Sequence, residues 1–129
     1  MNADEQGWLS EVCERVIGCA FEVSNTLGVG YLEKVYQRAL VSECRRQEIV
    51  AVAEQPMPVL YKGDVVGDYY IDVLVEGRLI VEIKCVNGFV PEHTAQTLNY
   101  LRGTSLPLAL MLNFKHPRVQ IKRLVNNFT

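Results

Sequence analysis

The chain has 129 residues, a net charge of −2 and a pI of about 5.7. Its length suits one domain, residues 1–129, and is too short for two separate cores. Charged residues make up 22% and hydrophobic residues 49%, which excludes a disordered or fibrous chain. The acidic balance excludes a protein that coats nucleic acid through bulk charge, so any phosphate binding has to be local.

Two amphipathic helices are predicted in the first third of the chain. Apolar residues recur every three or four positions from Leu9 to Leu27, which predicts the first helix. Gly28 ends it, because glycine adopts conformations that other residues avoid. A second apolar helical face starts at Leu32, and this helix is expected to end near Gln47.

The middle of the chain is predicted to form short strands. Pro56 and Pro58 lack the amide donor that a central strand uses, so they indicate edge or irregular structure between two strands. Turn residues separate four runs rich in β-branched and aromatic residues, at 49–53, 59–61, 65–75 and 79–84.

The last third is predicted to contain one helix and two strands. Pro91 suits the first turn of a helix, which ends at Gly103. The run 106–114 is a buried strand, and 119–125 is the last one. The expected order is α-α-β-β-β-β-α-β-β, and the crossover helix makes the strands on either side of it parallel neighbours. The fold class is therefore α/β, a mixed central sheet flanked by helices.

Location and redox state are predicted from what the sequence lacks. The first seven residues do not form a secretory signal, and no apolar run reaches the length of a membrane span, so a cytoplasmic protein without a membrane partner is expected. The four cysteines have neither metal-ligand spacing nor a disulfide pattern. They are expected to be reduced residues in or near the core.

Asp72, Glu82 and Lys84 place charges inside otherwise apolar strands. A hairpin with Val75 opposite Leu79 and a three-residue loop at 76–78 would set Asp72 opposite Glu82. Two carboxylates on facing strands repel each other unless a proton or a cation lies between them. This spacing therefore indicates a cation site.

Mg²⁺ suits such a pair, because it needs only one or two carboxylates beside water and substrate phosphate. Lys84, two residues after Glu82, could orient a metal-bound water or stabilise an oxyanion during attack on a phosphodiester. From the spacing alone, a surface salt bridge of Lys84 with Glu82 or Asp72 explains the pattern as well.

Three short motifs together carry a resemblance to a known family. They are G-x-x-E-x-x-Y at 30–36, Asp72 with Glu82-Ile83-Lys84, and Q-x-x-x-Y at 96–100. The sequence resembles the GxxExxY family of the PD-(D/E)XK nuclease superfamily over about residues 16–126. The resemblance implies a single PD-(D/E)XK nuclease-like domain.

The resemblance also implies a role for each matching residue. Metal ligands would be Asp72, Glu82, the backbone carbonyl of Ile83 and Glu33, the last directly or through water. Lys84 would be the catalytic lysine, and Gln96 and Tyr100 would lie beside the active site. Each has an ordinary alternative: Tyr100 as a core aromatic, Gln96 as an exposed helical residue, and Glu33 as a first-turn acid that favours the helix dipole.

The expected function is a nuclease dependent on Mg²⁺ or Mn²⁺ that hydrolyses nucleic acid, with DNA as the expected partner. A homodimer is the expected assembly if both strands of a duplex are cut. Two alternatives stay open: a binding or regulatory module with the nuclease fold and no turnover, and a metal-dependent hydrolase of a small phosphorylated substrate.

Overall fold

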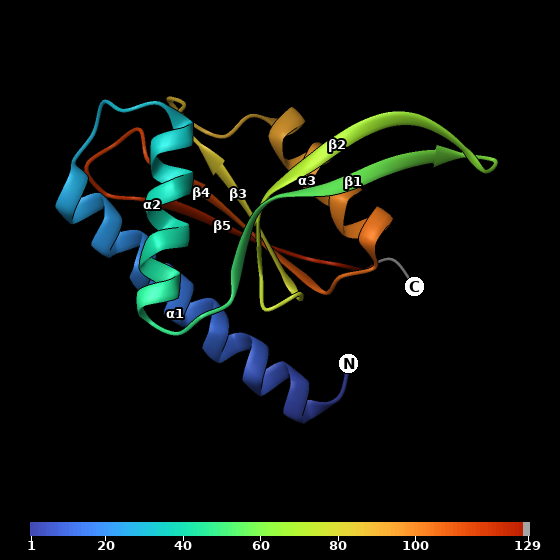
Figure 1. Ribbon diagram of the computed structural model, residues 1–129, viewed down its shortest axis with the longest axis horizontal. Helices are drawn as coiled ribbons and strands as arrows, with labels where there is room; N and C mark the ends of the chain where they lie inside the picture. The colour runs from blue at the N-terminus through green and yellow to red at the C-terminus, as the bar shows by residue number, and fades with distance from the viewer. Residues whose placement is uncertain (128–129) are drawn as a thin grey trace.

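The computed structural model describes residues 1–127. Their helices and strands follow in the order α1 (Ala3–Leu27), α2 (Glu33–Arg46), β1 (Ala51–Tyr61), β2 (Asp64–Val75), β3 (Leu79–Lys84), α3 (Pro91–Thr104), β4 (Leu108–Asn113) and β5 (Gln120–Val125) (Figure 1). No helix in this part of the chain has both the length and the apolar composition that a bilayer span needs.

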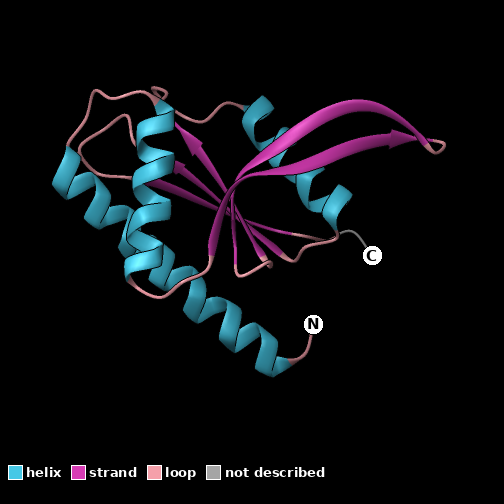
Figure 2. Cartoon of the chain, viewed as in Figure 1, coloured by secondary structure: helices cyan, strands magenta, loops and turns pink. Residues whose placement is uncertain are grey.

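The strands form one mixed sheet in the order β1-β2-β3-β4-β5. β3 and β4 are parallel, as predicted for strands joined by a crossover helix, and the other neighbours are antiparallel. α1 and α2 pack on one face of the sheet and α3 on the other (Figure 2). The predicted α/β class, a mixed sheet between layers of helix, is confirmed.

The first helix starts earlier than predicted, at Ala3 rather than Leu9. The side chain of Asn2 accepts a hydrogen bond of 2.8 Å from the Glu5 amide, so it satisfies a donor that the first turn leaves unpaired. Residues 3–8 are all exposed. They carry no apolar periodicity, which is why the pattern of the sequence placed the start too late.

The two strands predicted on either side of the prolines are one continuous strand, β1, so residues 1–127 contain five strands rather than six. Pro56 pairs with Tyr70 and Pro58 with Asp68. β1 lies at the edge of the sheet and has a neighbour on one side only. An edge strand tolerates proline because half of its amides are not needed for a ladder.

Side chains of β3 alternate between two hydrophobic cores. Val81 and Ile83 pack with α1 and α2, whereas Ile80 packs with Tyr100 and Leu101 of α3. Because alternate residues of a strand share a face, Glu82 follows Ile80 toward the α3 side. The strand is covered on both faces, and this burial leaves Glu82 only 3% exposed.

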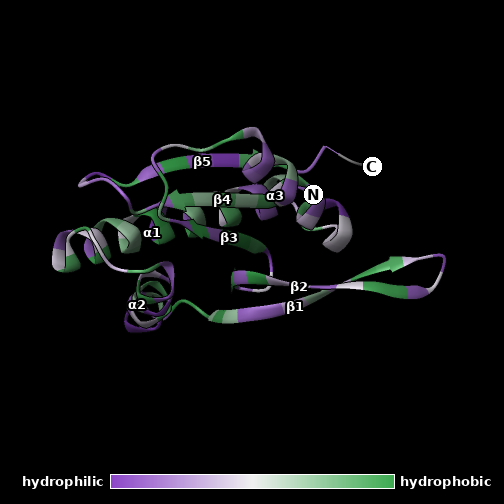
Figure 3. Ribbon diagram, turned by 90° about the horizontal axis from the view of Figure 1, so that it is seen from above, coloured by the Kyte–Doolittle hydropathy of each residue, from purple (hydrophilic) through white to green (hydrophobic). Residues whose placement is uncertain are grey.

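The β1–β2 hairpin extends beyond the rest of the sheet. β2 pairs with β3 only over Val73–Val75, and its earlier part pairs with β1 alone. We call residues 55–71, with their turn, the β1–β2 arm. Lys62 and Gly63 form the turn with φ values of 49° and 90°. The arm projects away from the helical layer of α1 and α2 and carries hydrophobic residues near its tip (Figures 1 and 3).

The four cysteines are free, as predicted. Cys13, Cys19 and Cys44 are buried and Cys85 is half-buried. Burial raises the pKa of Cys44 to about 12, so its thiol stays protonated at neutral pH. These residues therefore serve as small core side chains.

Tyr36 holds the loop that leads into α2. Its ring is fully buried and stacks on Phe114 with the ring centres 4.8 Å apart. Its hydroxyl donates a hydrogen bond of 2.6 Å to the carbonyl of Gly28 and accepts one of 3.3 Å from the amide of Tyr31. One side chain thus fixes both ends of the loop that presents Glu33.

Replacing Tyr36 with phenylalanine tests this contact. Tyr36→Phe keeps the ring but leaves the Gly28 carbonyl and the Tyr31 amide without their partner, so the free energy of unfolding should fall by about 1–3 kcal/mol. Tyr70→Phe is the control, because that side chain is 52% exposed. Urea denaturation compares the three proteins, and the same midpoint for Tyr36→Phe and wild type would contradict the contact.

Candidate active site

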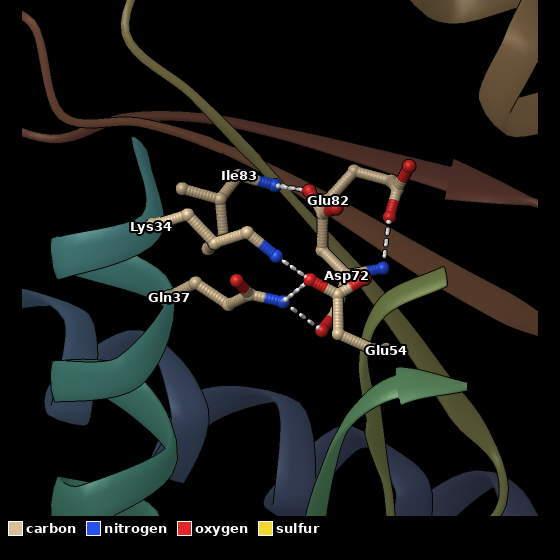
Figure 4. A network of polar contacts seen from close by, with 6 residues as sticks. All are labelled: Lys34, Gln37, Glu54, Asp72, Glu82 and Ile83. Atoms are coloured by element: carbon tan, nitrogen blue, oxygen red, sulfur yellow. Dashed lines mark hydrogen bonds and ion pairs between the residues drawn. The ribbon is translucent and has the colours of Figure 1, made fainter. Parts of the chain in front are cut away.

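The site lies where the β2–β3 ladder ends. The predicted register is confirmed, with Val75 paired to Leu79, and its continuation sets Asp72 opposite Glu82. At this position the backbone amides bond to side-chain carboxylates instead of to backbone carbonyls. The Asp72 amide donates a hydrogen bond of 2.9 Å to Oε2 of Glu82, and the Ile83 amide donates one of 2.7 Å to Oδ2 of Asp72 (Figure 4).

Burial and mutual repulsion keep this pair of acids short of negative charge. Burial first, and then the charge of Asp72, raise the pKa of Glu82 to about 8. Burial also raises the pKa of Asp72. The positive charge of Lys84 acts on both carboxyls in the opposite direction. Without a cation, the pair therefore retains a proton near neutral pH.

Glu33 and Lys84 approach the pair from two elements. Glu33 stands at the first turn of α2, and its Oε1 accepts a hydrogen bond of 3.3 Å from the Cys85 amide. Its negative charge raises the pKa of both Asp72 and Glu82, which places it within electrostatic reach of them. Three carboxylates and one ammonium thus surround the end of β3.

Tyr100 of α3 approaches the pair from the opposite layer, and Gln96 is bonded to it. Gln96 Nε2 donates a hydrogen bond of 3.0 Å to the Tyr100 hydroxyl. Burial, followed by the charges of Glu82 and Asp72, raises the pKa of Tyr100 to about 12. Tyr100 is therefore both a core aromatic of the α3 side and a neighbour of the carboxylates.

The sequence analysis missed Gln37. This residue is 4% exposed, and its Nε2 donates a hydrogen bond of 2.7 Å to the Asp72 carbonyl and one of 3.3 Å to Glu54 (Figure 4). Glu54 also forms an ion pair with Lys34. The available signal was a glutamine four residues before the buried Val41, on the face of α2 that packs against the sheet.

The donor set fits one hard cation held by few protein ligands. Among residues 1–127, no three Asp, Glu, His or Cys side chains stand close enough to share a metal ion. A cation here would take its carboxylate ligands from Asp72 and Glu82, each of which uses one oxygen for a backbone amide. Two carboxylates completed by water suit Mg²⁺.

The sequence matches the family model of the PD-(D/E)XK nuclease superfamily over residues 10–124. The chain belongs to this superfamily. Its nucleases use divalent metals, typically Mg²⁺, to act on nucleic acid. The fold brings Asp72, Glu82 and Lys84, the D and E-x-K residues predicted from the sequence, to one end of β3.

A solved structure described as "Crystal structure of SSO0001" shares the fold of this PD-(D/E)XK chain. The TM-score is 0.54 at 15% sequence identity, with 74% of this chain covered. The match covers 50% of the SSO0001 chain, so this protein spans about half the length of that one. No curated protein matches the sequence significantly.

The raised pKa of Glu82 predicts how stability depends on pH in metal-free buffer. In the unfolded chain Glu82 loses its proton near pH 4.5, whereas in the folded protein it keeps the proton up to about pH 8. The unfolded state therefore binds fewer protons across this window, and the free energy of unfolding falls as the pH rises. Glu82→Gln, which mimics the protonated acid, should flatten this fall.

Denaturant titrations at several pH values between 5 and 8 measure the effect. Glu11→Gln, at an exposed position of α1, is the control and should follow the wild type. A Glu82→Gln profile as steep as that of the wild type would show that this carboxyl does not carry the retained proton.

Proposed function

We propose that this PD-(D/E)XK protein is a divalent-metal-dependent nuclease that hydrolyses phosphodiester bonds of DNA, with Mg²⁺ or Mn²⁺ as its cofactor. The observation that carries the proposal is the Asp72–Glu82 pair, half-buried at Asp72 and buried at Glu82, with Lys84 beside it at the end of β3. The charge of Asp72 raises the pKa of the buried Glu82, so the two neighbouring acids create a place for a cation, and a nearby lysine adds the charge that phosphate chemistry requires.

Each residue of the pair has a defined task in this proposal. Asp72 and Glu82 would hold the cation, with the backbone carbonyl of Ile83 as a further ligand. When bound there, a divalent cation would supply a water of lowered pKa as the nucleophile at neutral pH. The amides of Asp72 and Ile83 keep the two carboxylates in place, because each carboxylate accepts a hydrogen bond from one of these amides.

The surrounding residues position the attacking water and the substrate and stabilise the charge on the phosphate. Lys84 orients the attacking water or stabilises the negative charge that develops on the phosphate. Glu33 acts through a water between α2 and the cation. The Gln96–Tyr100 contact of 3.0 Å places a hydroxyl beside the acids, where it can orient Lys84 or the substrate strand. These assignments, with Tyr36 as the tyrosine of G-x-x-E-x-x-Y, support placing the protein in the GxxExxY family.

The competing proposal is a nuclease-fold binding or regulatory module with little or no turnover. The net charge of −2 favours it, because a substrate-processing nuclease gains from a basic surface. The complete set of Asp72, Glu82 and Lys84 favours catalysis. Cleavage of both strands of a duplex would call for a homodimer, so the assembly state belongs to the same proposal.

A cleavage assay with matched variants tests the proposal. Wild type, Glu82→Ala and Lys84→Ala are incubated with single- and double-stranded DNA and RNA in Mg²⁺, Mn²⁺ or EDTA. Loss of the metal ligand or of the lysine should slow cleavage by about 100-fold or more, because each supplies charge stabilisation in a buried site. EDTA should abolish cleavage.

Glu11→Ala serves as the control for the loss of an exposed carboxylate and should cleave like the wild type. Equal rates for wild type and both site variants would refute the catalytic assignment. Metal-dependent binding without cleavage of any substrate would establish the binding module instead.

A further inference from the structure

A pocket of about 870 Å³ lies between α3 and the β1–β2 arm. Its walls include Met57, Val59 and Tyr69 from the arm and Gln96, Asn99 and Tyr100 from α3. The volume falls within the ~300–1,000 Å³ range of sites for small organic ligands. The tasks assigned above to the carboxylates and Lys84 leave this pocket without a function.

The pocket is connected to the carboxylate pair through Tyr100. Tyr100 lines the pocket and packs against Tyr69 of the arm, and after burial the charges of Glu82 and Asp72 raise its pKa, so it lies within electrostatic reach of the pair. A nucleic-acid strand with a phosphate at the pair would therefore bring a neighbouring nucleotide to the pocket. The occupant of the pocket should therefore belong to the same strand as the phosphate at the carboxylate pair.

Tyr69 offers a ring surface to that occupant. The side chain is 46% exposed, and its ring packs edge-on against Tyr100 with centres 6.2 Å apart at an angle of 63°. Base stacking on an exposed aromatic ring is a common way to bind unpaired nucleotides and tolerates any base. Gln96 and Asn99 add amide groups of the kind that bond to base edges.

The charges of the pocket favour a base over a phosphate. Glu92 lines it together with Arg102 and the imidazole of His93, so a carboxylate stands beside the basic side chains where a phosphate would have to bind. The carboxylate of Glu92 would repel a phosphate but not a neutral base. The remaining wall is largely apolar and aromatic, which suits a flat ring.

We propose that this pocket binds one unpaired nucleobase of the substrate, stacked on Tyr69, and that the protein acts on single-stranded or locally unpaired nucleic acid. The proposal rests on the proposed function for the position of the scissile phosphate. A base inside a duplex is stacked on both sides and paired at its edge, so it enters such a pocket only after unpairing.

Tyr69 and Tyr70 provide a matched pair for the test. They are neighbours on β2 and are similarly exposed, at 46% and 52%, but only Tyr69 lines the pocket. Binding is measured with a single-stranded oligonucleotide that carries the fluorescent base 2-aminopurine, in Ca²⁺ to follow binding. Wild type should quench the fluorescence. Tyr69→Ala should bind at least about fivefold more weakly and lose the quenching, whereas Tyr70→Ala should match the wild type.

Further variants and substrates keep the outcome decisive. Tyr69→Phe retains the ring and should quench like the wild type, and Tyr69→Leu replaces Tyr69→Ala if the latter fails to fold. A duplex of the same sequence should bind more weakly, with little change on loss of Tyr69. Cleavage in Mg²⁺ is followed in parallel for single strands and duplex.

The base pocket would be overturned if Tyr69→Ala quenched the fluorescence as much as the wild type, or if it lost single-strand and duplex binding equally. Cleavage by the wild-type protein would in that case leave the proposed function standing. Quenching that depends on Tyr69 without any cleavage would support the pocket and refute the nuclease. If light scattering shows a wild-type dimer that Tyr69→Ala converts to a monomer, the pocket is a protein interface and the proposal is wrong.

Discussion

The structure depends on one pair of reciprocal hydrogen bonds. The carboxylates of Asp72 and Glu82 each accept a hydrogen bond from a backbone amide of the facing strand. A β-ladder normally pairs amides with backbone carbonyls, and here two carboxylates take that place where β2 leaves β3. The same bonds hold the two acids close together, with Glu82 buried and Asp72 half-buried, in an arrangement that repulsion would otherwise disfavour. The end of the ladder and the site are therefore one feature, and the β1–β2 arm begins where it ends.

Residues of both helical layers position the carboxylate pair and its surroundings. On one side, Tyr36 fixes the loop before α2, and Gln37 holds the Asp72 carbonyl at 2.7 Å, so α2 positions both Glu33 and the strand. On the other side, α3 brings Tyr100 into contact with Tyr69 of the arm and within electrostatic reach of the acids. A strand buried on both faces supplies the low dielectric in which the few charges present act strongly.

The register could be predicted because strand parity and the length of the loop allow only one pairing that puts Asp72 and Glu82 on a common face. Other features depend on tertiary context. The early start of α1 rests on one capping side chain, Asn2, rather than on periodicity. The continuity of β1 through Pro56 follows from its place at the sheet edge, which is a property of the whole sheet. Gln37 has an unremarkable sequence environment, and only the packing of α2 shows what its amide contacts.

The central claim is that the end of the β2–β3 ladder is a site for one divalent cation. The most direct measurement is anomalous diffraction from crystals grown with Mn²⁺, which locates the metal without reference to activity. The account predicts one peak in contact with the carboxylates of Asp72 and Glu82, and its loss in Asp72→Asn. Crystals with bound Mn²⁺ elsewhere and no peak at this pair would contradict it.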